Sequence, residues 1–171
     1  EGLVNSFFLS DISMQQTLRE SEFYFPMEKA SVSVLGKLLT DHRNTNRKTQ
    51  THKNQAPRIT SKVRLPNYES LKGMMHGFID LVFEQKGKYY VCDYKSTHLG
   101  DSLNDYHHEA LRHNIEKNYY DLQYLIYSLA LHRYLKQNLA DYNCEEHFGG
   151  VFYLYLRGMS NVDDNQGAGV Y

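Results

Sequence analysis

The spacing of apolar residues along the chain predicts alternating strands and helices. In some stretches apolar positions recur every three or four residues, as on one face of a helix, and in others they alternate or run continuously, as in strands. The strongest helical stripe runs from about Tyr119 to Gln137, with leucine and isoleucine on one face. The predicted elements are, in chain order, a helix over 3–18, a strand over 23–25, a short helix after Ser31, a hairpin over 77–96, helices after 97 and a strand over 151–156.

The stretch 77–96, GFIDLVFEQKGKYYVCDYKS, predicts a hairpin that opposes two carboxylates. If its central Lys-Gly pair forms a two-residue loop, the numbers of facing residues sum to 173, and Asp80 lies opposite Asp93. Like charges in facing positions are destabilising, and a divalent cation such as Mg²⁺ compensates them because it takes carboxylate oxygens. Lys95, two residues after Asp93, projects from the same face and adds a positive charge beside the pair.

Two alternatives stay open for this hairpin. Simple alternation also permits Asp80 and Asp93 to point to solvent while the apolar residues between them fill the core. A three-residue loop with a glycine bulge would move the pairing by one position. The apolar run over 89–92 favours a buried strand that ends near Asp93, and hence the opposed pair.

Composition restricts the class of protein. A chain of 171 residues, 41% of them hydrophobic, is long enough to bury a core and predicts a single domain over 1–171. Cys92 and Cys144 lack C-x-x-C spacing, and the start of the chain has no signal-peptide pattern, so we expect a soluble cytoplasmic protein with Cys92 in its core. No apolar run is long enough to span a bilayer.

The net charge of −1 conceals a basic segment. Residues 43–72 contain eight basic residues and one acidic residue, Glu69, so the segment carries +7 and the remainder −8. This asymmetry suits an anionic partner near an acidic site, and a solvated loop explains it equally well. The polar composition around Pro57 predicts a flexible basic loop over about 41–70.

Five stretches follow one another in a fixed order: EFYFP, GFIDLVF, YYVCDYKSTHLG, YDLQYLIYSLALHRYL and HFGGVFYLYLRG. Together they resemble the RecB-type nucleases of the PD-(D/E)XK superfamily over about Glu20 to Gly158. The resemblance implies an α/β, restriction-endonuclease-like core with a mixed central sheet and flanking helices. In that family a helix with a metal-binding histidine precedes the first strand. We cannot find its pattern here, so we expect a nuclease domain truncated at both ends, with that upstream helix missing.

The resemblance also implies roles for individual residues. Asp80 and Asp93 match the acids that hold Mg²⁺ in the family, and the backbone carbonyl of Tyr94 completes the coordination. Lys95 matches the lysine that orients or activates the attacking water and stabilises charge developing on the phosphate.

Further roles are implied on the predicted long helix and before the first strand. Gln123 and Tyr127 match a Gln-x-x-x-Tyr signature and, four residues apart, share a helix face. They could order the waters of the site, the lysine or the DNA backbone, or only tie the helix to the sheet. Glu20 matches an acidic position that assists the metal site, with Glu22 as the neighbouring candidate. The histidines at 107, 108, 113 and 132 lack a zinc-binding pattern and predict a solvated helix face.

The function implied by the resemblance is Mg²⁺-dependent hydrolysis of phosphodiester bonds in single-stranded DNA and at linear duplex ends. The implied partners are the RecC and RecD subunits and the rest of a RecB-type helicase subunit, in double-strand break repair and degradation of linear DNA. The alternative is a non-catalytic, nuclease-like module that docks and regulates partner subunits. Asp80, Asp93 and Lys95 favour the enzyme, because a docking module has no chemical need for opposed acids beside a lysine.

Overall fold

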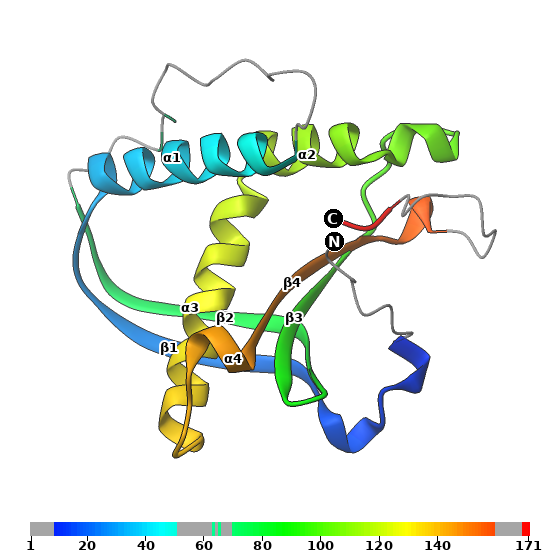
Figure 1. Cartoon of the computed structure of the whole chain (residues 1–171). Coiled ribbons are helices and arrows are strands. Elements are labelled where there is room, and N and C mark those ends of the chain that lie inside the picture. Colours follow the sequence, from blue (N-terminus) through cyan, green and yellow to red (C-terminus); the bar gives the residue numbers. More distant parts are fainter. Residues whose placement is uncertain (1–8, 51–62, 64, 66–69, 160–168) are drawn as a thin grey trace. The chain divides into compact units, whose positions relative to one another are not determined.

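The computed structural model describes residues 9–50, 63, 65, 70–159 and 169–171 (Figure 1). Its described strands and α-helices are β1 (Thr17–Ser31), α1 (Val32–Gln50), β2 (Ser70–Gln85), β3 (Lys88–Lys95), α2 (His108–Lys117), α3 (Tyr120–Asn138), α4 (Cys144–His147) and β4 (Phe148–Tyr155). They fall into two compact units, one built from the described residues of Glu1–Phe23 and Gly77–Tyr171 and the other from those of Tyr24–His76. No helix within the described ranges is long and apolar enough to cross a membrane.

The strands form a mixed sheet in the order β1-β2-β3-β4. β2 and β3 are antiparallel, whereas β3 and β4 are parallel and run side by side in Figure 1. Parallel neighbours need a long crossover connection, and the segment with α2 and α3 supplies it. This mixed sheet with flanking helices confirms the predicted α/β fold class.

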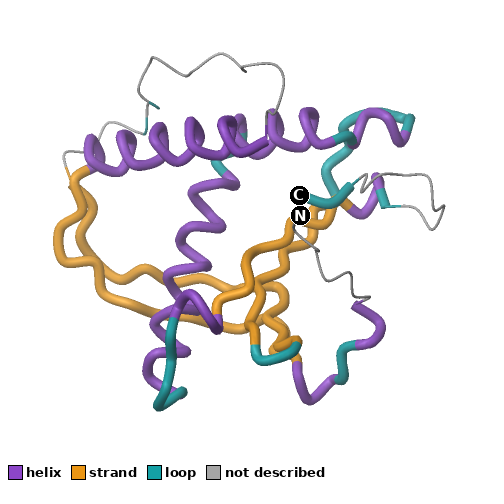
Figure 2. Tube along the Cα trace, in the orientation of Figure 1, coloured by secondary structure: helices purple, strands orange, loops and turns teal. Residues whose placement is uncertain are grey.

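The hairpin has the predicted register. Its pairs run from Leu81 opposite Cys92 to Gln85 opposite Lys88, and the facing numbers sum to 173. The two turn residues, a lysine and a glycine, have φ angles of 52° and 78°, the left-handed pair that a tight two-residue turn requires. Figure 2 shows this turn as the short loop that joins the two strands. The three-residue loop is therefore excluded.

A β-bulge in β4 determines which of its side chains share a face with Asp93. Tyr90 pairs with Gly150, although the residue before Tyr90 pairs with Phe148, so Gly149 is an extra residue in the ladder. Beyond the bulge, Asp93 pairs with Tyr153. Because side chains alternate between faces, a β4 without this extra residue would turn Tyr153 to the opposite face.

The unit that contains β3 and β4 has two clusters of buried residues. The first cluster consists of Tyr106, Leu111, Ile115, Tyr153 and Tyr155, and the second of Leu81, Phe83, Cys92 and Leu154. Burial is the main reason that the pKa of the Cys92 thiol rises to about 12, with a further contribution from the neighbouring carboxylates. This confirms that Cys92 is a core residue.

The N-terminal part differs from the prediction. The described portion of the predicted helix 3–18 forms short 3₁₀ turns at Leu9–Asp11 and Met14–Gln16, and β1 begins at Thr17. β1 is also far longer than the three residues predicted, because it hydrogen-bonds to β2 as an edge strand of the sheet. The loose apolar spacing of this segment therefore did not distinguish helix from strand. Residues 1–8 lie outside the described part.

The flexible basic loop predicted over 41–70 is helical in its first part. α1 continues to Gln50, through a stretch whose polar side chains bond along the helix. The Thr45 hydroxyl donates to the carbonyl of Asp41 at 3.0 Å, and Asn46 Nδ2 lies 3.1 Å from Nε2 of His42. Polar composition alone was thus a poor guide here. Positions 51–62, 64 and 66–69 of the predicted loop lie outside the described residues.

The bulge generates the first prediction. A Cβ on residue 149 would clash with the ring of Tyr90, so we expect Gly149→Ala to lower the free energy of unfolding by ~1–3 kcal/mol. Urea denaturation of the purified chain measures this. The control is Gly87→Asn in the hairpin turn, where a Cβ meets open space and asparagine tolerates the positive φ. An equal, small effect of both substitutions would show that the close approach at Gly149 does not constrain β4.

Candidate active site

Asp80 and Asp93 are the next residues after the last pair of the hairpin ladder. Asp93 is 3% exposed and Asp80 is partly buried, so Asp93 does not point to solvent as simple alternation allowed. Oδ2 of Asp80 accepts a hydrogen bond from the backbone N–H of Tyr94 at 2.9 Å. This bond reaches from β2 to β3 and fixes the first carboxylate beside the strand that holds the second.

The electrostatic environment of Asp93 favours a further positive charge. Burial raises the pKa of its carboxyl, the contact with Lys95 lowers it, and the charge of Asp80 raises it again, with a net upward result. Nζ of Lys95 lies 2.6 Å from Oδ2 of Asp93. The single ammonium therefore does not fully offset the cost of placing this carboxylate in a buried position beside another.

Lys95 is held on several sides. Its side chain is 11% exposed, and Nζ donates to Oε1 of Gln123 at 3.0 Å. Nζ also lies over the rings of Tyr120 and Tyr153, at 4.0 and 4.9 Å from their centroids. The lysine is thus surrounded by groups from β3, α3 and β4.

Gln123 and Tyr127 act on the lysine from α3. Nε2 of Gln123 donates to the Tyr127 hydroxyl at 2.8 Å, while Oε1 accepts from Lys95 and, at 3.0 Å, from the Tyr153 hydroxyl. Because a lysine can only donate, this arrangement fixes which end of the amide faces it. Burial raises the pKa of Tyr127, which keeps its phenol neutral. The sequence left open whether Gln123 and Tyr127 order water, the lysine or the DNA backbone, or only tie the helix to the sheet. These contacts favour two of these roles: the pair holds Lys95, and it links α3 to the sheet.

Glu20 is not brought into this cluster. It is exposed on β1, where its φ of 47° marks an irregularity in the strand. Across the described ranges, no three His, Cys, Asp or Glu side chains lie close enough together to hold one metal ion. The structure therefore unites Asp80, Asp93 and Lys95, and leaves Glu20 without a described contact to them.

The donor atoms at the two carboxylates fit a hard divalent cation. Asp80 and Asp93 supply carboxylate oxygens from adjacent strands. Within a β-strand, the N–H and C=O of one residue point to the same side, so the carbonyl of Tyr94 faces the side on which its N–H meets Asp80. Carboxylate and carbonyl oxygens are the ligands that Mg²⁺ and Ca²⁺ take.

The sequence analysis assigns no role to Tyr120 and Tyr153, whose rings the structure places against Lys95. A signal exists for Tyr120, because it precedes Gln123 by three residues and so shares its helix face. Tyr153 has no comparable signal. It lies in a strand rich in aromatic residues, and only the bulge at Gly149 determines its face.

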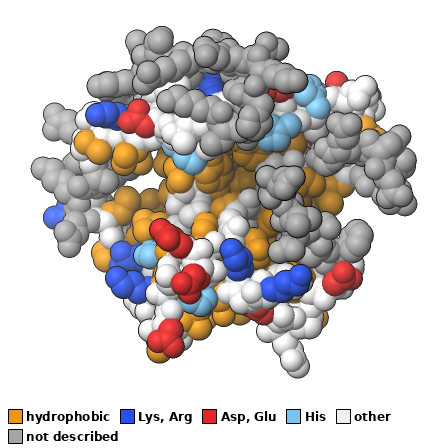
Figure 3. Space-filling view, viewed as in Figure 1, with side chains coloured by type: hydrophobic (Ala, Val, Ile, Leu, Met, Phe, Trp, Pro, Cys, Tyr) orange, Lys and Arg blue, Asp and Glu red, His pale blue; other side chains and the backbone are white. Residues whose placement is uncertain are grey.

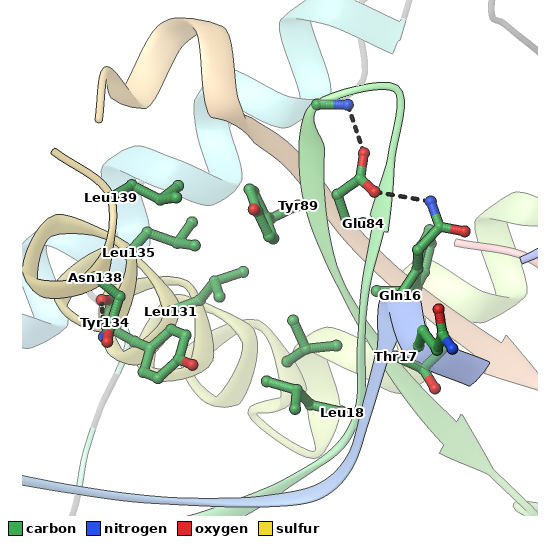
Figure 4. A pocket seen from close by; sticks show the side chains of 14 residues that line it. Gln16, Thr17, Leu18, Glu84, Tyr89, Leu131, Tyr134, Leu135, Asn138 and Leu139 are labelled. Atoms are coloured by element: carbon green, nitrogen blue, oxygen red, sulfur yellow. Dashed lines mark hydrogen bonds between the residues drawn. The ribbon is translucent and has the colours of Figure 1, made fainter. Parts of the chain in front are cut away.

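A separate cavity of about 380 Å³ lies between the start of β1, the hairpin and the end of α3 (Figure 4). Leucine and aromatic side chains form much of its lining, and Asp80, Asp93 and Lys95 do not take part. The carboxylate of Glu84 at its edge accepts from Gln16 Nε2 at 2.8 Å and from the hairpin-turn N–H at residue 87 at 2.6 Å. These bonds tie the N-terminal segment to the turn that sets the register.

Charge is mixed on the surface. On the face shown in Figure 3, acidic and basic side chains are interspersed over its lower part. Of the basic segment 43–72, the positions 43, 47, 48 and 72 fall in described elements. Its predicted contact with an anionic partner stays a prediction.

Comparison with known proteins gives a consistent result. The PD-(D/E)XK nuclease superfamily matches residues 13–168. The chain is 38% identical over 160 residues to the "RecBCD enzyme subunit RecB" of Escherichia coli K12, covering 93% of this chain and 12% of that protein. The corresponding subunit of Haemophilus influenzae is 39% identical over 153 residues, covering 89% and 11%. That of Mycobacterium tuberculosis H37Rv is 35% identical over 161 residues, covering 88% and 14%.

The five motifs most resemble those of one protein, the carboxyl-terminal nuclease domain of the RecB subunit of exodeoxyribonuclease V. The similarity to RecB subunits confirms that resemblance. The chain spans about an eighth of the length of these relatives. Its match to the nuclease description covers the hairpin, the lysine and the Gln-x-x-x-Tyr helix together. The chain therefore belongs to the PD-(D/E)XK nuclease superfamily.

Proposed function

We propose that this chain hydrolyses DNA phosphodiester bonds with Mg²⁺, as the nuclease domain of an exodeoxyribonuclease V (RecBCD) type of enzyme. Nucleases of this superfamily are metal-dependent, and Mg²⁺ is the ion that suits a small set of hard oxygen ligands completed by water and phosphate. The main support is the contact between Asp93 and Lys95 beside Asp80, which brings one buried acid, one partly buried acid and one ammonium together.

The proposed metal ligands are the carboxylates of Asp80 and Asp93 and the backbone carbonyl of Tyr94. A bound divalent ion supplies Lewis acidity and a more acidic water. Its charge would also favour the ionised form of Asp93, whose pKa is raised mainly by burial and further by the charge of Asp80. Glu20 remains a candidate to assist this site by resemblance alone, since its described position is exposed.

The proposed role of Lys95 is to stabilise charge on the phosphate. Water attacks phosphorus, the bond from phosphorus to the leaving oxygen breaks, and the leaving oxygen takes up a proton, without a covalent intermediate. The ammonium of Lys95 faces the negative charge that develops on the phosphoryl oxygens. Gln123 holds the ammonium, and Tyr127 holds Gln123 through the amide nitrogen. Both residues therefore act through the lysine.

The wider context of the proposal comes from the relatives, which are named as subunits of the RecBCD enzyme. We propose that the chain acts on single-stranded DNA and linear duplex ends, together with RecC and RecD subunits and the rest of a RecB subunit. Such an enzyme would serve double-strand break repair and the degradation of linear DNA. Association with purified RecC and RecD subunits, measured by gel filtration, tests the partner assignment.

The second candidate is the non-catalytic docking module. A docking role would not require an ionised acid to be held at 3% exposure against a lysine. Burying such an ion pair has a desolvation cost, which a docking role gives no reason to retain. The geometry therefore favours the nuclease, and the cleavage assay separates the two.

The second prediction concerns cleavage. We expect the chain to degrade single-stranded and linear duplex DNA with Mg²⁺ and not with EDTA. Asp93→Ala and Lys95→Ala should each lower kcat by ~100-fold or more, because each removes a group that stabilises charge in the transition state. Gel assays with end-labelled DNA measure the rates.

The matched control is Lys88→Ala, which removes an exposed lysine from the opposite end of the same strand β3. Its rate should stay within about 2-fold of the parent chain's. If folded parent chain shows no Mg²⁺-dependent cleavage, the docking module becomes the better account. Equal losses in the Lys88 and Lys95 variants would remove the specific role of Lys95.

The third prediction concerns metal binding and pH. At a Mg²⁺ concentration 100 times Kd, the parent chain should gain about 2.7 kcal/mol in the free energy of unfolding, and Asp93→Asn should gain little. Without metal, the raised pKa of Asp93 means that its ionised form is disfavoured in the folded state. Parent stability relative to Asp93→Asn should therefore fall as pH rises above the ordinary carboxyl value of 3.8.

Urea denaturation with and without Mg²⁺ between pH 4 and pH 7 makes both measurements. Asp101→Asn is the control, because this exposed acid pairs with His98 outside the site. A parent chain whose stability ignores Mg²⁺, or Asp93→Asn gaining as much as the parent, would contradict the metal assignment.

A further inference from the structure

Lys95 lies against two tyrosine rings to which the motif resemblance gives no role. Its Nζ is 4.0 Å from the centroid of the Tyr120 ring and 4.9 Å from that of Tyr153. A cation within about 6 Å of the centre of an aromatic face is attracted by the ring quadrupole. Tyr120 comes from α3 and Tyr153 from β4, so two separate elements direct aromatic faces at one ammonium.

Hydrogen bonds link the rings to the other partners of the lysine. The Tyr153 hydroxyl donates to Oε1 of Gln123 at 3.0 Å and to the backbone carbonyl of Tyr120 at 3.1 Å. The same Gln123 oxygen accepts from Nζ of Lys95. The Tyr153 hydroxyl therefore links β4 to two residues of α3, Tyr120 and Gln123, and Gln123 is the residue that contacts the lysine.

The two rings are themselves fixed by packing. Their centroids lie 6.0 Å apart with an interplanar angle of 23°. Tyr153 is 1% exposed, and Tyr124 packs edge-on against it with centroids 6.0 Å apart. Tyr153 lies in the core, and the partly buried Tyr120 packs against it, so contacts other than the ammonium also hold both rings.

We propose that Tyr120 and Tyr153 form an aromatic cage that positions Lys95 for phosphodiester hydrolysis. A lysine side chain has a flexible four-carbon stem, so contacts with Asp93 and Gln123 alone leave it several ways to move. A misplacement of about 1 Å in an active site can lower the rate by ~100-fold. The cage removes this freedom on the sides that the hydrogen bonds leave open. Both tyrosines are positioning residues, and this inference rests on the proposed nuclease function.

The test uses substitutions at Tyr120, because Tyr153 belongs to the buried cluster and its loss would disturb the core. Tyr120→Leu removes the ring, whereas Tyr120→Phe keeps the ring and removes only the hydroxyl. Tyr134→Leu is the matched control, since it removes a half-exposed tyrosine from the other end of the same helix and leaves both cage rings and their packing in place. Thermal denaturation establishes that each variant is folded.

The first readout is the NMR signal of the Lys95 side chain, recorded without metal. Protons above an aromatic face are shifted upfield, so the Cε–Hε signal of Lys95 should lie upfield of the other lysines in the parent chain. The signal is assigned by its absence from Lys95→Arg. We expect the upfield position in Tyr120→Phe and Tyr134→Leu, and a return toward the other lysines in Tyr120→Leu.

The second readout is the rate of cleavage of single-stranded DNA with Mg²⁺. Tyr120→Leu should lower kcat by ~10- to 100-fold with KM changed less than about 3-fold. Tyr120→Phe should restore kcat to within about 3-fold of the parent, and Tyr134→Leu should stay in the same range. Loss of kcat that the phenylalanine rescues is not expected from a general loss of packing.

The outcomes separate the two proposals. If the parent chain cleaves DNA and folded Tyr120→Leu cleaves equally fast, the cage has no positioning role and the nuclease function stands. The same holds if Tyr134→Leu loses as much kcat as Tyr120→Leu. If the parent chain does not cleave DNA at all, the proposed function fails and the positioning role fails with it, even where the upfield Lys95 signal shows that the cage exists.

Discussion

Asp80 and Asp93 lie one residue beyond the last pair of the hairpin ladder, and the hydrogen bond from the Tyr94 N–H holds the Asp80 carboxylate beside the strand of Asp93. Asp93 is buried, and burial raises the pKa of its carboxyl. The charge of Asp80 raises this pKa further, in spite of the ammonium of Lys95. An arrangement of this kind is unfavourable in the folded chain unless more positive charge is present. The other groups of the site are arranged around this buried carboxylate: Lys95 contacts it, and Gln123 and the tyrosine rings contact Lys95.

The lysine shows how distant parts of the chain converge on that charge. Lys95 stands on the same strand as Asp93, Gln123 reaches it from α3, and Tyr153 reaches it from β4. Each comes from an element whose position has its own cause: a two-residue turn, a helix packed on the sheet and a bulge at Gly149. The positions of the site residues therefore depend on the pairing register of β2 with β3 and of β3 with β4, as well as on which residues are present.

The sequence predicted the hairpin and, as one of two possible registers, its pairing, because a Lys-Gly pair between apolar runs permits a two-residue turn without excluding a three-residue loop. It also predicted the shared face of Gln123 and Tyr127, since helical spacing is a local property. The prediction of β1 was too short, because pairing with β2 rather than local sequence determines its length. The end of α1 was predicted as a loop, because its polar side chains gave no sign of a helix. The role of Tyr153 could not be predicted, because a single extra residue in β4 sets its face.

A divalent cation held by the carboxylates of Asp80 and Asp93 would supply the positive charge that this site lacks. Anomalous X-ray diffraction from crystals of the chain soaked in Mn²⁺ locates such an ion without reference to activity. We expect a peak about 2.1 Å from carboxylate oxygens of both Asp80 and Asp93, absent in Asp93→Asn crystals. A peak elsewhere, at the exposed histidines or at Glu20 alone, or a peak that persists in Asp93→Asn, would show that these two carboxylates do not hold the ion.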